Sequence, residues 1–281
     1  MAAAVQITAR GPLAAVMAAA EAIEADPALE AAAWSMVEED EARRVWRIDA
    51  FPCSAGEARD LETALASDLL IVTRAQLADA DWVALSLSGL PPVRAGRFFV
   101  FGAHDRGRVP KNVIPLRIEA GAAFGTGHHD TTLGCLLEFD ALRRRRRFRR
   151  VLDLGAGTGV LAIAAAKTGA RRVVGIDIDP RAVAVARENA RLNGASGEFT
   201  LADHPIGRGY DLIFANILAA PLIALAPRIA RALAPGGVVI LSGLLRGQAR
   251  AVRARFLGAG LRAERRRDLG PWATLVMRRR G

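Results

Sequence analysis

The sequence predicts an α/β protein, in which a small α+β domain precedes a larger, doubly wound parallel sheet. Strand and helix patterns alternate from about residue 151 onward, as in a sheet covered by helices on both faces. The first 75 residues instead follow the order strand, helix, strand, strand, helix, strand, which is typical of a ferredoxin-like domain. Charge also divides the chain: residues 1–100 hold 8 Arg against 15 Asp and Glu, whereas residues 101–281 hold 31 Arg and Lys against 14 Asp and Glu.

In the front part, apolar residues at helical spacing predict one helix, and a capping box predicts the start of the other. The box consists of Ser54 and Glu57, three residues apart. We expect strands at residues 4–10, 33–37, 45–50 and 69–73, and helices at 12–24 and 54–66. An acidic domain of this kind is expected to attract a basic protein and to repel nucleic acid.

The periodicity fades over residues 76–117, where Pro91 and Pro92 interrupt regular structure. We predict a linker and entry segment there, with a short apolar strand at 97–101. The predicted domains are therefore an acidic recognition domain at 1–75 and a second domain at 118–281.

The back part contains seven strand candidates, which predict a Rossmann-like sheet. The last two lie too close together for a helix between them and should form a hairpin. The predicted strands are 151–154, 172–177, 198–201, 211–216, 238–242, 261–268 and 273–278, with helices at 133–139, 160–168 and 180–192 among those between them.

Several classes of protein are not favoured by the composition. No run of 18 apolar residues and no signal peptide is present, so we expect no membrane span and a cytoplasmic protein. Cys53 and Cys135 lie far apart and suggest neither a disulfide framework nor a metal site. His128 and His129 are adjacent but lack a third ligand at plausible spacing, so no metal is predicted.

A glycine-rich turn follows the first strand of the back domain. Asp153 precedes Gly155, Gly157 and Gly159, and Asp177 ends the next strand, an arrangement that holds a nucleoside. A dinucleotide site would place its third glycine one residue later. The alternative is a turn that binds nothing. The spacing resembles the first motif of class I S-adenosylmethionine-dependent methyltransferases, which implies that cofactor. Asp203, after the third strand, would approach the adenine amino group or lie on the surface.

Two further motifs carry candidate chemistry. Asn216 ends an apolar strand and would place an amide at the sheet edge, where it could accept hydrogen bonds from an amine and aim the nitrogen lone pair; the alternative is a strand-terminating or capping role. Thr131 and Thr132 begin a helix after a Phe-Gly-Thr-Gly segment, and either can present a hydroxyl to a ligand.

Together these motifs resemble the ribosomal protein L-eleven methyltransferase family (PrmA), most closely over residues 118–245. The resemblance implies methyl transfer from S-adenosylmethionine to lysine and N-terminal amines of that large-subunit ribosomal protein, which the front domain would recognise. It assigns cofactor contacts to Thr132, Gly155, Asp177 and Asn216. Asp130 stands where the family often has proline, which is a departure from the family's pattern in this loop.

Arginine runs leave other functions open. Residues 143–147 and 149–150 are a solvated helix end or, less favoured, a sequence-independent contact with RNA. An RNA methyltransferase and a non-catalytic ribosome-assembly binder are therefore the alternatives to a protein methyltransferase. The acidic front domain argues against the first, and the glycine turn with Asp177 and Asn216 argues against the second. The modified amines and the oligomeric state are not readable from the sequence.

Overall fold

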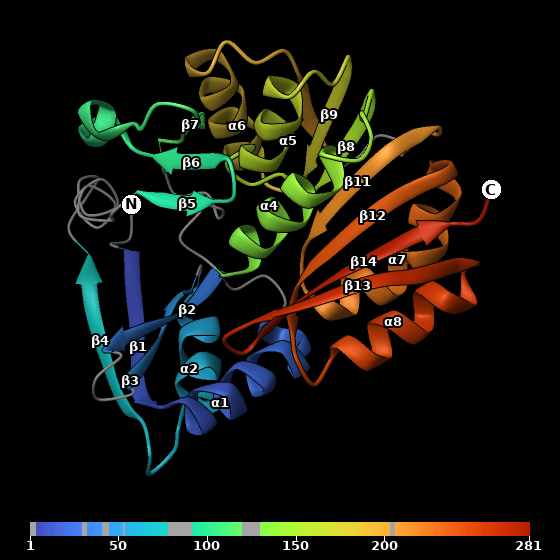
Figure 1. The fold of residues 1–281 in the computed structure, drawn as a ribbon. Helices are drawn as coiled ribbons and strands as arrows, with labels where there is room; N and C mark the ends of the chain where they lie inside the picture. The colour runs from blue at the N-terminus through green and yellow to red at the C-terminus, as the bar shows by residue number, and fades with distance from the viewer. Residues whose placement is uncertain are drawn as a thin grey trace. The chain divides into compact units, whose positions relative to one another are not determined.

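The chain divides into two compact units, residues 1–82 and 83–281. A computed structural model describes residues 4–29, 33–40, 45–52, 54–77, 92–119, 130–202 and 206–281 (Figure 1). No helix within these ranges is long and apolar enough to cross a membrane.

The first unit is a four-stranded antiparallel sheet with two helices. Its strand order is β2-β3-β1-β4, so β1 and β3 are central, which matches the predicted βαββαβ arrangement. Ser54 caps α2 as predicted, since its hydroxyl accepts the Glu57 backbone N–H at 3.1 Å. The elements are β1 (Ala4–Pro12), α1 (Leu13–Ala25), η1 (Pro27–Leu29), β2 (Ala33–Asp40), β3 (Val45–Phe51), α2 (Ala55–Ala64) and β4 (Ile71–Leu77).

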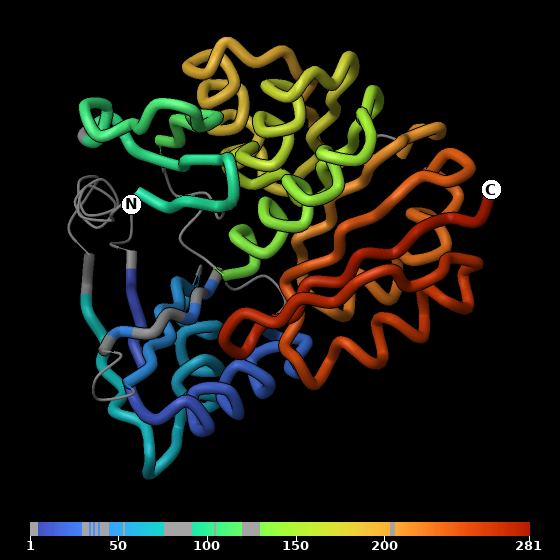
Figure 2. Tube along the Cα trace, in the orientation of Figure 1, coloured from blue at the N-terminus to red at the C-terminus, as the bar shows by residue number. Residues whose placement is uncertain are grey.

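The second unit is built on a seven-stranded sheet of order β10-β9-β8-β11-β12-β14-β13. The first five strands are parallel neighbours, and β14 and β13 form the predicted antiparallel hairpin at one edge. This hairpin is the red end of the trace in Figure 2. The strands are β8 (Arg150–Leu154), β9 (Arg172–Asp177), β10 (Glu198–Leu201), β11 (Tyr210–Asn216), β12 (Leu233–Leu245), β13 (Leu261–Leu269) and β14 (Trp272–Arg279).

Helices cover both faces of this sheet, because its strands alternate their apolar side chains between two cores. Val151 and Phe214 belong to the core under α4, α5 and α6, whereas Leu152 and Ile213 belong to the core under α7 and α8. The helices are α4 (Asp130–Arg143), α5 (Val160–Lys167), α6 (Pro180–Leu192), α7 (Ala219–Ala232) and α8 (Ala249–Gly258). The doubly wound fold predicted from the sequence is confirmed.

Residues 93–117, which we predicted as part of a linker, instead form a small sheet of the second unit. Its order is β5-β6-β7, and Phe98 and Leu116 belong to the same core as α4 and α5. Gln76 and Leu77, also assigned to the linker, complete β4. The elements are β5 (Val93–Ala95), β6 (Phe98–Phe101), η2 (Ala103–Arg108) and β7 (Ile114–Arg117).

Candidate functional site

The predicted site residues gather at the carboxyl edge of the large sheet. Strands β9, β8 and β11 are parallel neighbours, so their ends at Asp177, Leu154 and Asn216 lie along one edge. In a doubly wound sheet this edge, where the strand order reverses beside the first strand, is the usual place for a ligand.

The turn after β8 depends on its glycines. Gly155, Gly157 and Gly159 all have positive φ, at 75°, 52° and 79°, a region that L side chains rarely adopt. A Cβ on Gly155 would also lie 2.2 Å from Cγ2 of Ile217, the residue after Asn216. The turn therefore packs closely against the end of β11 and needs glycine for both reasons.

Asp177 ties this turn to the end of β9. One carboxylate oxygen accepts the Gly157 backbone N–H at 2.8 Å and the other accepts the Asp179 N–H at 3.0 Å. Each oxygen keeps a further acceptor site, and the side chain is only half-buried, so ribose hydroxyls could still donate to it. Asp179 caps α6 by accepting the Arg181 backbone N–H at 2.8 Å.

Large apolar side chains are exposed at the same edge. Ile178, directly after Asp177, is 86% exposed; Leu201, the last residue of β10, is 36% exposed, and Leu218, two residues after β11, is 37% exposed. An aromatic base that covered these side chains would remove their apolar surface from water, which stabilises the bound state. None of the three was among the site residues predicted from sequence.

Asn216 and Thr132 are brought together as the motifs predicted. The Asn216 side-chain Nδ2 donates to the Thr132 hydroxyl, 3.4 Å away, across 84 residues of sequence. The Asn216 carbonyl Oδ1 is buried and has no hydrogen-bond partner among the described residues. Since buried acceptors are nearly always satisfied, this oxygen is a candidate to receive an N–H from a ligand.

Asp153 lies beneath the turn rather than on its surface. It is fully buried, and one carboxylate oxygen accepts the Ala162 backbone N–H of α5 at 2.9 Å. Burial raises the pKa of this carboxyl well above its usual range, and the negative charge of Asp177 adds to the effect. Its second oxygen has no hydrogen-bond partner among the described residues.

Asn189 on α6 is hydrogen-bonded to the glycine turn, and no local pattern in the sequence indicated this role. Its side chain accepts the Glu119 N–H at 2.9 Å and donates to the carbonyls of Glu119 and Thr158, at 3.2 and 3.0 Å. Asn193, one helical turn later, exchanges the same pair of bonds with Arg117. The two amides thus fix the end of β7 and the residues after it to α6, and Asn189 alone also bonds the glycine turn.

Some predicted residues lie outside the described ranges. They are Asp203, His128, His129 and the Phe-Gly-Thr-Gly segment at 124–127. Helix α4 begins at Asp130 and extends to Arg143, beyond the predicted end at Phe139. The residues that do meet at the edge fit S-adenosylmethionine, because they offer ribose acceptors, apolar cover, a close backbone turn and an unpaired amide oxygen.

Comparison with known proteins points the same way. Residues 4–280 match the family described as ribosomal protein L11 methyltransferase (PrmA). The ribosomal protein L11 methyltransferase of Caulobacter sp. (strain K31) is 55% identical over 98% of this chain and 97% of its own length. That of Agrobacterium fabrum is 44% identical over 89% and 90%. The crystal structure of ribosomal protein L11 methylase from Lactobacillus delbrueckii subsp. bulgaricus superposes with a TM-score of 0.61 and 30% identity, over 68% of this chain and 99% of that chain.

Proposed function

Because the chain belongs to the ribosomal protein L11 methyltransferase family and is an S-adenosylmethionine-dependent methyltransferase, we propose that it methylates ribosomal protein L11 in the cytoplasm, on lysine and N-terminal amines. The unpaired carbonyl oxygen of Asn216 is the observation that carries this proposal. The backbone of Asn216 lies beside the glycine turn, since a Cβ on Gly155 would be 3.9 Å from the Asn216 backbone carbonyl.

Most residues of this edge bind the cofactor, and Asn216 also orients the acceptor amine. When bound, S-adenosylmethionine supplies an electrophilic methyl group on a positively charged sulfur. Asp177 accepts hydrogen bonds from the ribose, Ile178 covers the base, and Gly155 and Gly157 allow close backbone approach. We assign Asp153 to hold the start of α5 under the turn, and Asp203 to the adenine amino group. Asn216 and Thr132 complete the cofactor site on the side of β11.

Asn216 also acts on the acceptor amine. A lysine or N-terminal amine attacks only as the neutral form, with its lone pair aligned with the bond that breaks. The Asn216 side-chain oxygen accepts one N–H of that amine and so aims the lone pair, while the Thr132 hydroxyl fixes the amide orientation. This geometry needs no strong general base once the amine is deprotonated.

We further propose that the first unit recognises the substrate protein. Residues 1–82 hold 15 Asp and Glu against 6 Arg, a net charge of −9. A hollow of about 430 Å³ lies between α1 and the chain after α2, beside Leu69, which is 66% exposed. Asp60, four residues before the lining residue Ala64 on α2, and Asp68, between the lining residues Ser67 and Leu69, are exposed and form no ion pair with the described residues. An acidic rim around an apolar hollow suits a basic protein.

The catalytic assignment is tested with Asn216→Ala. We expect it to bind S-adenosylhomocysteine only a few-fold more weakly than the parent by calorimetry, because Asn216 is one of several cofactor contacts, and to lose methyl transfer to L11 by about 10²-fold, the cost of misplacing a reacting group. Ile217→Val, next to it, is the matched control and should retain activity. Undiminished methylation by Asn216→Ala would remove this residue from the mechanism.

The assignment of the first unit is tested with Asp60→Asn/Asp68→Asn. This pair should raise KM for L11 several-fold and leave kcat unchanged, because it acts on docking alone. Glu188→Gln/Glu198→Gln removes two charges from the second unit and serves as the control. An equal rise in KM for both pairs would contradict a specific docking role.

A further inference from the structure

Exposed arginines gather at the amino edge of the large sheet, opposite the cofactor site. We call them the arginine edge: Arg147, Arg149, Arg171, Arg172 and Arg208. The backbone joins them, since the N–H groups of Arg171 and Arg172 both donate to the Arg149 carbonyl, at 2.8 and 2.9 Å. Arg150, the first residue of β8, donates to the carbonyl of Arg208 at 3.0 Å.

This grouping could not be read from the sequence. The run at 143–150 is partly structural: Arg143 and Arg144 pair with Asp140, and Arg146 donates to the Gly236 carbonyl at 2.7 Å. The fold brings the remaining arginines of the run beside Arg171, Arg172 and Arg208, which come from two other segments.

The arginine edge is not neutralised by the residues around it. None of its five side chains forms an ion pair with a carboxylate in the part of the chain that the structure describes. Asp211 is nearby, but one of its oxygens already accepts the backbone N–H groups of Arg149 and Arg150, at 2.7 and 3.0 Å. Glu198, at the start of β10, is the other carboxylate on these strand starts.

Positive charge continues along the edge toward β14. Because β14 runs antiparallel to β12, its end at Arg279 lies at the same edge as the strand starts. There Arg231, Arg279 and Arg280 line a hollow of about 350 Å³. Four strand spacings separate β9 from β14, which is about 19 Å at roughly 4.8 Å per strand.

We propose that this edge binds the phosphate backbone of RNA without modifying it. Guanidinium groups recognise phosphate oxygens through paired hydrogen bonds, and a row of them matches a linear polyanion. The site of methyl transfer is remote, because β11 spans seven residues from Tyr210 to Asn216, or about 20 Å at roughly 3.3 Å per residue. Bound RNA therefore leaves the cofactor edge open to a protein substrate.

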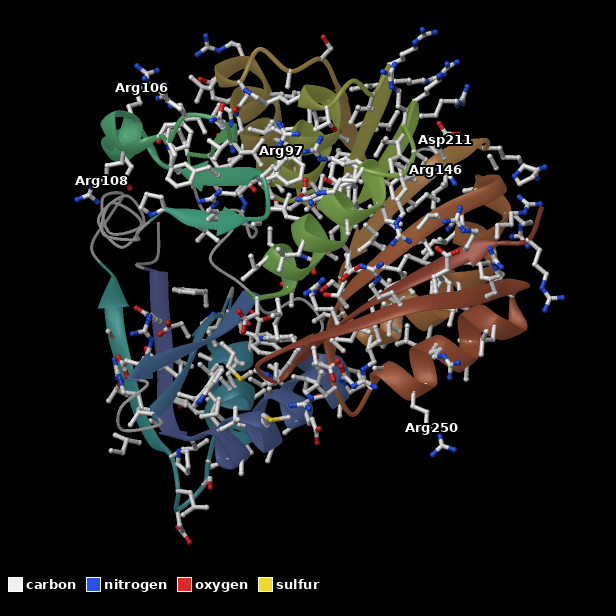
Figure 3. All side chains as sticks on the ribbon, viewed as in Figure 1. Arg97, Arg106, Arg108, Arg146, Asp211 and Arg250 are labelled. Carbon is white, nitrogen blue, oxygen red and sulfur yellow. The ribbon has the colours of Figure 1, made fainter. Side chains whose placement is uncertain are left out.

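The observations favour RNA over an anionic membrane. Stable attachment to a membrane surface needs apolar side chains beside the basic ones. The exposed apolar residues Ile178, Leu201 and Leu218 all lie at the opposite ends of the strands, and Leu257 lies on α8. Figure 3 shows Arg146 and Asp211 at one end of the sheet and Arg250, on α8, far from them.

The test compares two pairs of neutralised arginines in the full chain. Arg171→Gln/Arg208→Gln changes the edge, and Arg250→Gln/Arg253→Gln removes two exposed arginines from α8. Binding of a fluorescein-labelled 20-nucleotide uridine oligomer is measured by anisotropy from 50 to 200 mM KCl. We expect the edge pair to reduce the slope of log K against log salt by about 1.4, at roughly 0.7 per phosphate contact with a single strand. Between 50 and 200 mM KCl, the edge pair should therefore lose about sevenfold less affinity for the oligomer than the parent loses.

The α8 pair should keep the parent slope, and both pairs should unfold in urea at the parent midpoint, which shows that they fold. No binding by the parent at 50 mM salt, or equal weakening by both pairs, would overturn the proposal. So would tighter binding to phosphatidylserine vesicles than to RNA, or transfer of labelled methyl groups into the oligomer. Since binding is measured without methyl transfer, the result is independent of the proposed function.

Discussion

Replacing Gly155 by alanine tests whether the cofactor turn is shaped by close packing as well as by backbone conformation. The left-handed backbone at Gly155 costs an L residue roughly 1–2 kcal/mol. The new Cβ would also meet Ile217 Cγ2 at 2.2 Å, well inside van der Waals contact, and overpacking of this kind costs roughly 1–3 kcal/mol. We therefore expect Gly155→Ala to lose about 2–5 kcal/mol of unfolding free energy and most of its affinity for S-adenosylhomocysteine.

Gly194→Ala separates the two causes. Gly194 also has positive φ, at 58°, but no atom lies within 4 Å of a Cβ built on it. This variant should lose roughly 1–2 kcal/mol, from strain alone, and bind cofactor normally. Urea unfolding and calorimetry measure both quantities. If Gly155→Ala lost no more stability or affinity than Gly194→Ala, the packing argument would be wrong.

A double variant adds an internal check on the same contact. Ile217→Ala removes the Cγ2 atom that the new Cβ would meet. Combined with Gly155→Ala it should show a favourable coupling energy, because the clash is absent from the double variant. If the losses of unfolding free energy of the two single variants simply added in the double variant, the contact with Ile217 Cγ2 would not be the cause of the loss in Gly155→Ala.

Four other substitutions probe the site. Ile178→Ser should weaken cofactor binding about tenfold, since burying such a side chain is worth roughly 1.5–3 kcal/mol, and should leave stability within about 0.5 kcal/mol because the side chain is exposed. Asn189→Ala should lower both cofactor affinity and stability by about 1–3 kcal/mol, whereas Asn193→Ala, which does not contact the turn, should lower stability alone; equal effects on calorimetric affinity would refute the distinction. Asp153→Asn should gain stability relative to the parent as pH rises from about 4 to 8. The pKa of this carboxyl is raised in the folded parent. Above the unfolded pKa of roughly 4, the unfolded state therefore releases its proton while the folded state keeps it, and the free energy of unfolding of the parent falls as pH rises. Urea unfolding at pH 5 and pH 8 checks this, and an identical difference at both values would contradict it.

The parts of the fold that could be predicted are those with a local cause. The glycine spacing after Asp153, the capping box at Ser54 and the alternation of strands and helices each depend on neighbouring residues, and the structure has them where the sequence indicated. The meeting of Thr132 with Asn216 was also predictable, because both motifs fall at ends of elements that a parallel sheet brings to one edge.

Features with a long-range cause could not be predicted. The small sheet at 93–117 shows little periodicity, because Phe98–Phe101 is buried throughout and gives no alternation. Asn189 acts on residues 70 and 31 positions earlier in the chain, through backbone groups that leave no trace in residue type. The arginine edge likewise depends on strand register, which pairs Arg150 with Arg172.

Strand β13 has a consequence for how the protein behaves among copies of itself. It is the outermost strand of the hairpin, nine residues long, and among the described residues only β14 pairs with it. An unpaired edge of that length is a template on which another molecule can add a strand. Arg262, Arg265 and Arg266 are exposed on it and pair with Glu264, Glu138 and Asp268. The strand still holds four Arg against two carboxylates, so two such edges would repel each other before their backbones could pair. The strand that completes the sheet is thus also the one that keeps it from growing into a fibre.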